Sequence, residues 1–463
     1  MRGRNVIGGS ITIIKRLHRS CRIFSGRWSP LFLAAICGCN AGLFRESLHE
    51  VYIPRIQRGD ACFAANVLGA RGALLSVLAH FFEHGRWGSL VETAVEGQNL
   101  TTEDQLFILM QSGLLLTATR GYSAPEVQIC YEHVESLSHS LNRPLALYSA
   151  LISQWRYSLT TDKLTATMQV AKRIYLLAQE ENNAALMIGA YRALAVTHHY
   201  LGDFASAREY AMRGIEIWRS GAGQSHPEDL DTPVIRCLCF KALSEWHLGE
   251  IASCKGTMAE AISLAKELND MHSLALALYH AAILANLEGN PAEVERLASD
   301  TIELSARQNF AFWLAGGEVL RGWARSACGD TAEGLARIEG GIEDWMATSA
   351  ILWVSYFLAL KAEALYLADR TSEALEAINE AEAVAERLEE RWWCADLHRL
   401  RGVFLAAIGA DDAQIEASFC EAIRTAKEQK SVSLQKRAEA TYAEYRRQKA
   451  TVSGGHGFRL PLC

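Results

Sequence analysis

Two pairs of histidines come nearest, in type and spacing, to a metal site in this chain. His80 and His84 stand one helical turn apart with Glu83 between them, and His198 and His199 are consecutive. Residues four apart share a helix face, whereas consecutive residues point about 100° apart. Zinc sites need at least a third protein ligand, and neither pair has one at a suitable spacing. We expect no metal site, and we expect one of the consecutive pair to be packed and the other solvated.

Cysteines and glycines give no stronger sign of catalysis or of a cofactor. The 12 cysteines are scattered, and the two close pairs, Cys37/Cys39 and Cys237/Cys239, lack the C-x-x-C spacing of zinc sites. Most of the others fall in apolar helical stripes, which predicts reduced, structural thiols in a cytoplasmic protein. The dipeptide Gly-Lys is absent, so no phosphate-binding loop of the G-x-x-x-x-G-K-[ST] type exists. We therefore predict no cofactor and no enzyme activity.

The feature that positions these residues is a repeat of two helices joined by a tight corner. Such a corner stands at Leu201-Gly202-Asp203, inside the stretch from Tyr191 to Trp218. A fixed period is the signature of a stacked repeat array. From position 249 onward the corner recurs every 40 residues. The corner residues in this part of the chain are Gly249, Gly289, Gly329, Asp369 and Gly409.

One unit shows how such a pair forms. Apolar residues recur at helical spacing from Ala193 to Leu201 and again from Phe204 to Ile215. Gly202 can adopt the positive φ that ends a helix, and Asp203 is a good N-cap for the next one. One pair cannot bury both apolar stripes, so each needs its neighbours. The pattern predicts an all-α fold, a right-handed α-solenoid of tetratricopeptide-like helix pairs with a period of about 40 residues.

The repeats divide the chain into four parts. We expect a basic, poorly ordered leader at 1–58, leading helices at 59–95, the array at 96–449 and a flexible tail at 450–463. The spacing between the corners at Gly202 and Gly249 is longer than elsewhere because of a polar insertion at 220–233, which we predict to be the array's most protease-sensitive loop.

Charge is distributed unevenly between the leader and the rest. Residues 1–58 carry 10 Lys and Arg against 2 Asp and Glu, whereas the whole chain has a net charge of −7. The acidic array is a poor nucleic-acid surface because phosphate contacts need clustered basic side chains. The apolar run at 30–42 is too short to span a bilayer and lacks a clear signal-peptide cleavage site. We predict no membrane span, and we interpret the leader as a remnant of a longer protein or a misassigned start rather than an export signal.

Four blocks resemble one bacterial family: ATRGYSAPEV, ALAVTHHYLGDFASAR, FWLAGGEVLRGWARSACGDTAEGLARI and ERWWCADLHRLRGVFL. Its members join an adenylate/guanylate cyclase or winged-helix regulator head to a central AAA/STAND-type ATPase and a tetratricopeptide tail. The resemblance runs from about Gln98 to about Lys449. It implies the C-terminal sensor or scaffold segment of such a protein. No cyclase or ATPase motif is present, so no catalytic residue transfers from that family.

These observations predict a non-catalytic scaffold or sensor that binds a protein or peptide in signalling. A second hypothesis is a regulatory segment that acts with a separately encoded cyclase or ATPase. A third is a small-molecule sensor with a metabolite in the groove.

A row of tryptophans at the same period has two interpretations. Trp313, Trp353 and Trp393 stand 40 residues apart. They could form an aromatic strip along a groove, or each could fasten the start of a helix to the previous repeat. A strict period favours packing, because a binding site seldom needs the same residue in every repeat.

If tetratricopeptide geometry applies, the first helix of each pair lines a concave groove. Positions three, six, ten and thirteen before each corner residue then face a partner, and they form an aromatic set of mixed charge that suits a peptide. The candidate groove residues are Arg192, His199, Arg236, Trp246, Tyr279, Asn286, Trp323, Tyr356, Glu363, Tyr366, Asp396 and Arg399.

Overall fold

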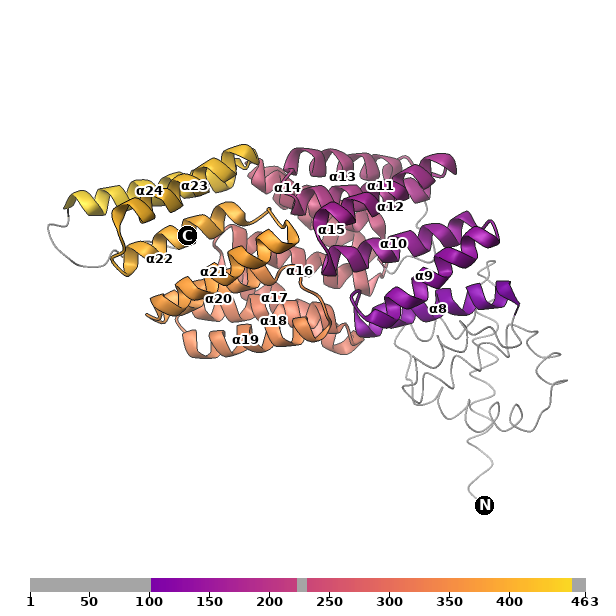
Figure 1. Ribbon diagram of the computed structural model, residues 1–463, viewed down its shortest axis with the longest axis horizontal. Helices are drawn as coiled ribbons and strands as arrows, with labels where there is room; N and C mark the ends of the chain where they lie inside the picture. The colour runs from indigo at the N-terminus through magenta and orange to yellow at the C-terminus, as the bar shows by residue number, and fades with distance from the viewer. Residues whose placement is uncertain (1–100, 223–230, 452–463) are drawn as a thin grey trace, which may run out of the picture. The chain divides into compact units, whose positions relative to one another are not determined.

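The computed structural model describes residues 101–222 and 231–451, and these form seventeen helices and no strand (Figure 1). The all-α array of helix pairs predicted from the 40-residue period is therefore confirmed. The leader, the leading helices, the His80/His84 pair, and most of the inserted loop and of the tail lie outside the described residues.

The helices alternate between two kinds, which we call inner and outer, followed by the last helix, α24 (Val432–Thr451). The inner helices are α8 (Thr102–Arg120), α10 (Pro144–Thr161), α12 (Ala184–Tyr200), α14 (Pro233–His247), α16 (Met271–Leu287), α18 (Ala311–Ala327), α20 (Val354–Leu367) and α22 (Cys394–Ala407). The outer helices are α9 (Pro125–Ser140), α11 (Leu164–Glu180), α13 (Phe204–Arg219), α15 (Ile251–Glu267), α17 (Pro291–Gln308), α19 (Thr331–Ala347), α21 (Thr371–Leu388) and α23 (Asp412–Glu428).

The corner between α12 and α13 has the predicted geometry. Gly202 adopts a φ of +80°, in the left-handed region that glycine enters without steric cost. The Asp203 carboxylate accepts a hydrogen bond of 3.1 Å from the backbone N–H of Ser206 and so caps α13. In the one corner of the regular series that lacks glycine, Asp369 takes a φ of +58°. The same backbone geometry therefore recurs with either residue.

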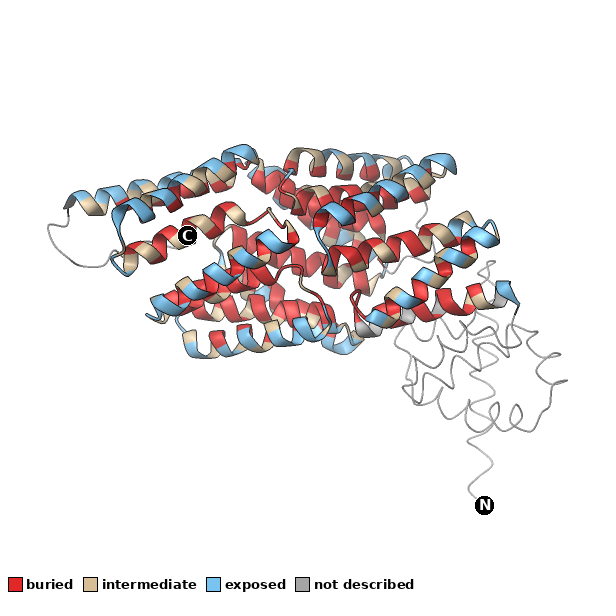
Figure 2. Cartoon of the chain, viewed as in Figure 1, coloured by how far each residue is buried: buried red, intermediate tan, exposed pale blue. Residues whose placement is uncertain are grey.

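Inner and outer helices differ in how much of their surface is buried (Figure 2). Every residue of α16 from Ala275 to Leu287 is buried, so this helix has no solvent face. In α13, by contrast, the buried residues form a single stripe from Phe204 to Ile215. A helix that is covered on all sides belongs to the middle of a core rather than to an open groove. The core of the array is therefore made chiefly by the inner helices.

The inner helices are covered because the array winds back on itself. The carbonyl of Thr160, in the last turn of α10, accepts a 2.8 Å hydrogen bond from the N–H of Ile351, which lies before α20. The carbonyl of Tyr200, at the end of α12, accepts one of 2.7 Å from Arg391, which lies before α22. Thr160 and Ile351 are as far apart in sequence as Tyr200 and Arg391. The later repeats therefore lie on the earlier ones in a fixed register.

Contacts of the same kind continue along the array at α14 and α16. The His247 ring contacts the Ser431 hydroxyl at 3.0 Å, and Ser433 donates a hydrogen bond to the carbonyl of Trp246. Arg437 of α24 donates to the carbonyl of Leu287. We call this line of contacts between the ends of α10, α12, α14 and α16 and the later repeats the seam.

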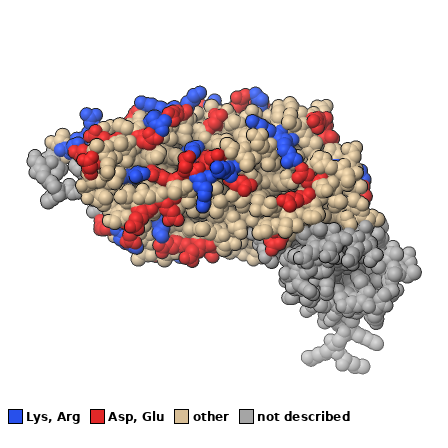
Figure 3. Space-filling view, in the orientation of Figure 1, with Lys and Arg blue, Asp and Glu red and all other residues tan. Residues whose placement is uncertain are grey.

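The surface of the outer helices carries both signs of charge. On the face shown in Figure 3, Lys and Arg are interspersed with Asp and Glu. Several of these charges pair within one helix, as Arg296 does with Glu293 and Asp300. Within the described part of the chain, no helix combines the length and the apolar character needed to cross a membrane.

Candidate functional site

The twelve predicted groove residues face the interior of the array, but all of them are covered. Their exposed fractions range from 0 to 7%. The prediction of an open groove is therefore wrong. The inner helices of later repeats pack on those of earlier repeats, and these side chains fill the space between them. The buried set is Arg192, His199, Arg236, Trp246, Tyr279, Asn286, Trp323, Tyr356, Glu363, Tyr366, Asp396 and Arg399.

One cluster in this interior is centred on Asp231, which directly follows the undescribed part of the inserted loop. Its carboxylate accepts hydrogen bonds from Arg236 Nε at 2.7 Å, from Arg192 Nη1 at 3.4 Å and from Arg156. The three arginines come from consecutive inner helices, α14, α12 and α10. Burial alone would raise the pKa of Asp231, but the three guanidinium charges outweigh it and hold the pKa well below its usual range. Asp231 is therefore the anion that ties these three helices together.

A second cluster lies among α16, α18 and α20. Glu363 is buried and accepts a 2.7 Å hydrogen bond from the indole N–H of Trp323. Burial raises the pKa of Glu363 to about 7. Nearby, the Tyr356 hydroxyl donates to the Asn286 side chain at 2.6 Å, which joins α20 to α16.

A third buried carboxylate, Glu390, lies just before α22. It accepts hydrogen bonds from the Ser355 hydroxyl at 2.9 Å and from the Trp392 indole at 2.7 Å. Burial raises its pKa to about 7 as well. By contrast, Arg399 binds both oxygens of Asp396, at 2.7 and 3.0 Å, so that pair keeps its charges. The interior thus holds two carboxyl groups with a pKa of about 7, Glu363 and Glu390, and one ion pair, Asp396 with Arg399.

Buried histidines form the most unusual part of this interior. His199 donates or accepts a 3.2 Å hydrogen bond with Ser244, and His280 Nδ1 donates to the carbonyl of Leu276 at 2.8 Å. Burial lowers the pKa of both rings to about 3, that of His272 to about 4, and that of His247 well below its usual range. All four rings are therefore neutral at pH 7. His198, on the neighbouring face, is only partly buried, as expected for one packed and one more exposed histidine.

These pKa shifts predict that acid destabilises the array. Below the ordinary histidine pKa of 6.5, these histidines bind protons in the unfolded chain but stay neutral in the folded protein. The free energy of unfolding therefore falls as the pH drops from 6.5 toward 4. Glu363 and Glu390 act in the opposite sense, since they bind protons in the folded state between pH 7 and 4.5. With four histidines against two glutamates, we expect the urea midpoint to fall between pH 7 and 5.

The variant His280→Leu tests this account. Leucine occupies the equivalent position in later repeats, at Leu320, Leu360 and Leu400, so the fold should accept it. We expect His280→Leu to match the wild type at pH 7.5 and to lose less stability at pH 5. An unchanged pH profile would contradict the role of His280.

The tryptophan row is part of the same interior. Trp313, Trp353 and Trp393 have exposed fractions of 1 to 3%, and the rings of Trp313 and Trp353 are 6.4 Å apart. Their burial favours the interpretation that they pack repeats together.

Asp231 and Glu390 were not predicted from the sequence. Asp231 stood in a stretch assigned to a polar loop, and no motif or period singled out Glu390.

Comparisons with known proteins identify a relative but no family. No family model matches the chain. A protein of Rhizobium meliloti (strain 1021), named Uncharacterized protein R02095, is 22% identical over 343 residues, which cover 73% of this chain. The chain spans about a third of the length of that relative, because the match covers 33% of it.

Three solved structures match the chain at low similarity. A Rap protein complexed with competence and sporulation factor has a TM-score of 0.47 at 10% identity, covering 74% of this chain and 97% of that one. Bacillus thuringiensis PlcR in complex with the peptide PapR7 and DNA has a TM-score of 0.32 at 14% identity, with 80% and 99% covered. The apo form of RapI has a TM-score of 0.28 at 12% identity, with 66% and 99% covered. These scores lie below 0.5, so the tetratricopeptide-like array rests on the helix pairs of the described residues themselves. The link to a cyclase or ATPase stays a prediction.

Proposed function

We propose that this protein is a non-catalytic scaffold or sensor whose inner helices bind a peptide or protein segment. The observation that carries the proposal is a set of buried polar atoms in the interior that have no hydrogen-bond partner among the described residues. They include Nε2 of His199, His247 and His280, the hydroxyl of Tyr279 and the indole N–H of Trp393.

Such atoms are costly in a core that serves stability alone. Leaving one buried polar group unpaired costs about 1–3 kcal/mol, and more than nine in ten buried polar groups in proteins are paired. Backbone and side-chain groups of a peptide could pair with these atoms. The interior therefore has the donors, acceptors and aromatic rings of a peptide-binding groove, held closed by the seam.

The proposal requires the seam to open, so that partner groups replace the contacts made across it. These contacts are hydrogen bonds to helix ends, such as those to the carbonyls of Thr160 and Tyr200, and ring contacts such as that between Tyr200 and Trp353. Within each helix pair, the outer helix also buries its own apolar stripe, such as that of α13 from Phe204 to Ile215. Separating the later repeats from the earlier ones would expose the twelve interior residues while the helix pairs stay packed.

A thiol cross-link across the seam tests the proposal. Thr165 and Glu389 lie on opposite sides of it, joined by a 3.0 Å hydrogen bond. We would replace both with cysteine in a background that lacks the exposed Cys328 and Cys420, and join them with a short bis-maleimide. The full chain is the bait for capture and mass spectrometry. We expect the cross-linked protein to lose partners that the uncross-linked protein captures.

The matched control joins Arg208 of α13 and Glu250, the residue just before α15, which form a partly exposed ion pair that does not cross the seam. This cross-link should leave capture unchanged. If the seam cross-link retains the same partners as the control, binding does not use the interior and the proposal is wrong.

The second hypothesis is a regulatory segment that works with a separately encoded cyclase or ATPase. The length of the Rhizobium meliloti relative supports this hypothesis. The matched part is 33% of that protein, so the relative is about three times as long as the part that this chain matches. An adjacent reading frame that encodes a P-loop ATPase would support it.

A further inference from the structure

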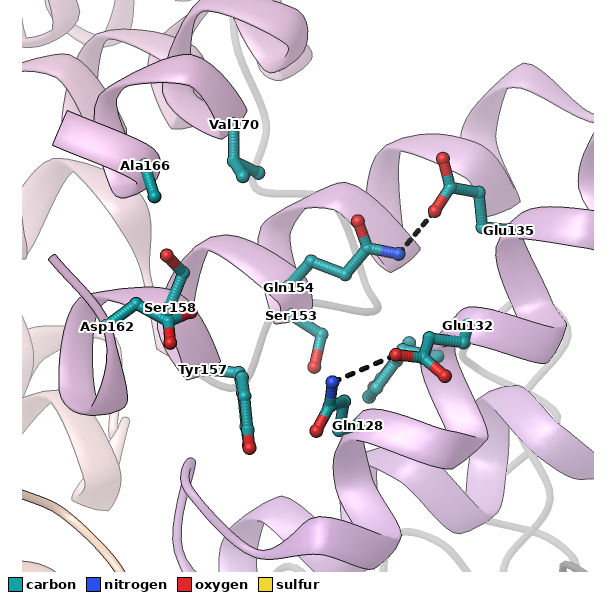
Figure 4. A pocket seen from close by; sticks show the side chains of 11 residues that line it. Gln128, Glu132, Glu135, Ser153, Gln154, Tyr157, Ser158, Asp162, Ala166 and Val170 are labelled. Atoms are coloured by element: carbon teal, nitrogen blue, oxygen red, sulfur yellow. Dashed lines mark hydrogen bonds between the residues drawn. The ribbon is translucent and has the colours of Figure 1, made fainter. Parts of the chain in front are cut away.

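A hollow of about 340 Å³ opens between α9, α10 and α11, away from the interior described above (Figure 4). This volume is at the lower end of the range of small-ligand sites. The lining residues that matter to the argument are Gln128, Glu132 and Glu135 of α9, Ser153 and Tyr157 of α10, and Asp162 at the end of α10.

The hollow is lined by a small residue at a position where the last three repeats carry leucine. Nine positions before the corner residue, α10 carries Ser153, as α8 carries Ser112 and α12 carries Ala193. In α10 this small residue faces the hollow. The equivalent residues in the later repeats are Ala193, Phe240, His280, Leu320, Leu360 and Leu400.

The next position of α10 lacks the basic residue that three later repeats use. In three later repeats a basic residue there pairs with a glutamate of the preceding outer helix. These pairs are Arg321 with Glu295 at 3.1 Å, Lys361 with Glu339 at 2.9 Å and Arg401 with Glu382 at 2.6 Å. In α10 the position holds Gln154, whose neutral amide donates to Glu135. The inner helix at the hollow thus lacks the cation that these three repeats carry.

The carboxylates around the hollow are left with too little positive charge. Arg173 pairs with Glu135. Glu132 accepts a 2.9 Å hydrogen bond from Gln128 but forms no ion pair within the described residues. The carboxylate of Asp162 has neither a hydrogen bond nor an ion pair in the same part of the chain. An uncompensated negative charge therefore lines the hollow.

A hydroxyl in the wall of the hollow gives independent evidence for a ligand. Ser153 is only 5% exposed, and its side chain makes no hydrogen bond within the described residues. Figure 4 shows it pointing into the hollow, between Tyr157 and Gln128. Because the hydroxyl faces the hollow and has no partner among these residues, it is available to a ligand group there.

We propose that this hollow binds a ligand carrying an ammonium or guanidinium group. Glu132 and Asp162 supply the negative charge, Ser153 and Gln128 accept hydrogen bonds from its N–H groups, and the Tyr157 ring lies beside it. The carboxylates do not converge as metal ligands do, because the described residues contain no group of three or more His, Cys, Asp or Glu that could hold a metal ion. The cation is therefore an extended organic one. The site does not depend on the proposed function of the interior.

Calorimetric titration of the full chain tests the proposal with L-arginine, its uncharged analogue L-citrulline, spermidine and the tripeptide Ala-Arg-Ala. We expect arginine or spermidine to bind at least ten times more tightly than citrulline. Tighter binding of the tripeptide than of free arginine would identify the natural ligand as a peptide side chain, and the reverse order as a free amine. No binding of any cation at millimolar concentration would overturn the proposal, and so would preferential binding of Ca²⁺.

Two pattern-restoring variants introduce the residues that later repeats carry at these positions, such as Leu320 and Arg321. Ser153→Leu refills the space, and Gln154→Arg supplies the missing internal cation. Each should keep or raise the melting temperature and reduce cation binding at least tenfold. The matched control is Glu376→Gln, which removes an exposed carboxylate of α21 and should leave binding unchanged. If both pattern-restoring variants bind arginine and spermidine like the wild type, the hollow is not the site.

Discussion

Replacing Trp353 with alanine is expected to lower the free energy of unfolding by about 3–5 kcal/mol, the cost of deleting a large buried aromatic side chain. The indole is 3% exposed and lies before α20, where several parts of the array meet. Its ring is 4.9 Å from Tyr279 of α16, 5.3 Å from Trp345 of α19 and 6.1 Å from Tyr200 of α12. Alanine would leave a cavity that rigid helix ends on several sides cannot close.

The shape of the unfolding transition should change as well. Repeat arrays unfold together only while the interfaces between repeats hold. Because Trp353 contacts Tyr200 across the seam, its loss should uncouple the turns and broaden the transition. Urea melts followed by circular dichroism measure both effects. Leu176→Ala, at a side chain that is 55% exposed, is the control and should melt like the wild type. A normal melt of Trp353→Ala together with loss of partner binding would identify the tryptophan row as a binding strip.

The helix pairs could be predicted because their causes are local. Gly202 and Asp203 end one helix and begin the next through their own backbone preference and side chain, and the structure shows both roles. The tryptophan period likewise reflects packing between adjacent repeats. Local rules of this kind repeat in the sequence, so they can be recognised without knowing how far the array curves.

The closed interior could not be predicted in the same way, because it depends on curvature summed over several repeats. Residues such as Thr160 and Ile351 meet only because every intervening repeat turns by the right amount. One sequence signal was nevertheless available. The stretch from Leu274 to Leu287 is apolar almost throughout, and a helix that is apolar all round has no face to offer a water-filled groove.

The site residues that were missed are those whose partners lie far away in the sequence. Asp231 stands in a polar loop, and nothing near it indicates that Arg156 and Arg192 reach it. Ser153 and Gln154 are ordinary helix residues by themselves. They become informative only when they are aligned with Leu320 and Arg321 at the repeat period, a comparison that the sequence permits.

Removing the charge of Asp231 is expected to have an effect as large as that of Trp353→Ala. Asparagine keeps the shape of the side chain, but the guanidinium groups of Arg156, Arg192 and Arg236 then lose the carboxylate that they share. Breaking a buried ion pair by removing one partner costs about 3–5 kcal/mol, because the remaining charge stays buried. We therefore expect Asp231→Asn to lower the urea midpoint strongly at pH 7.

The pH dependence separates this charge effect from a packing effect. The pKa of Asp231 lies well below 3.8 in the folded protein, so its contribution is present above pH 3.8 and is lost only as the pH falls toward the folded pKa. The stability difference between wild type and Asp231→Asn should therefore be constant from pH 8 to pH 5. Asp300→Asn, which removes an exposed partner of Arg296, should leave the midpoint unchanged. If Asp231→Asn also melts like the wild type, the three arginines do not depend on this carboxylate, and the interior owes its stability to the aromatic packing around Trp353 rather than to its charges.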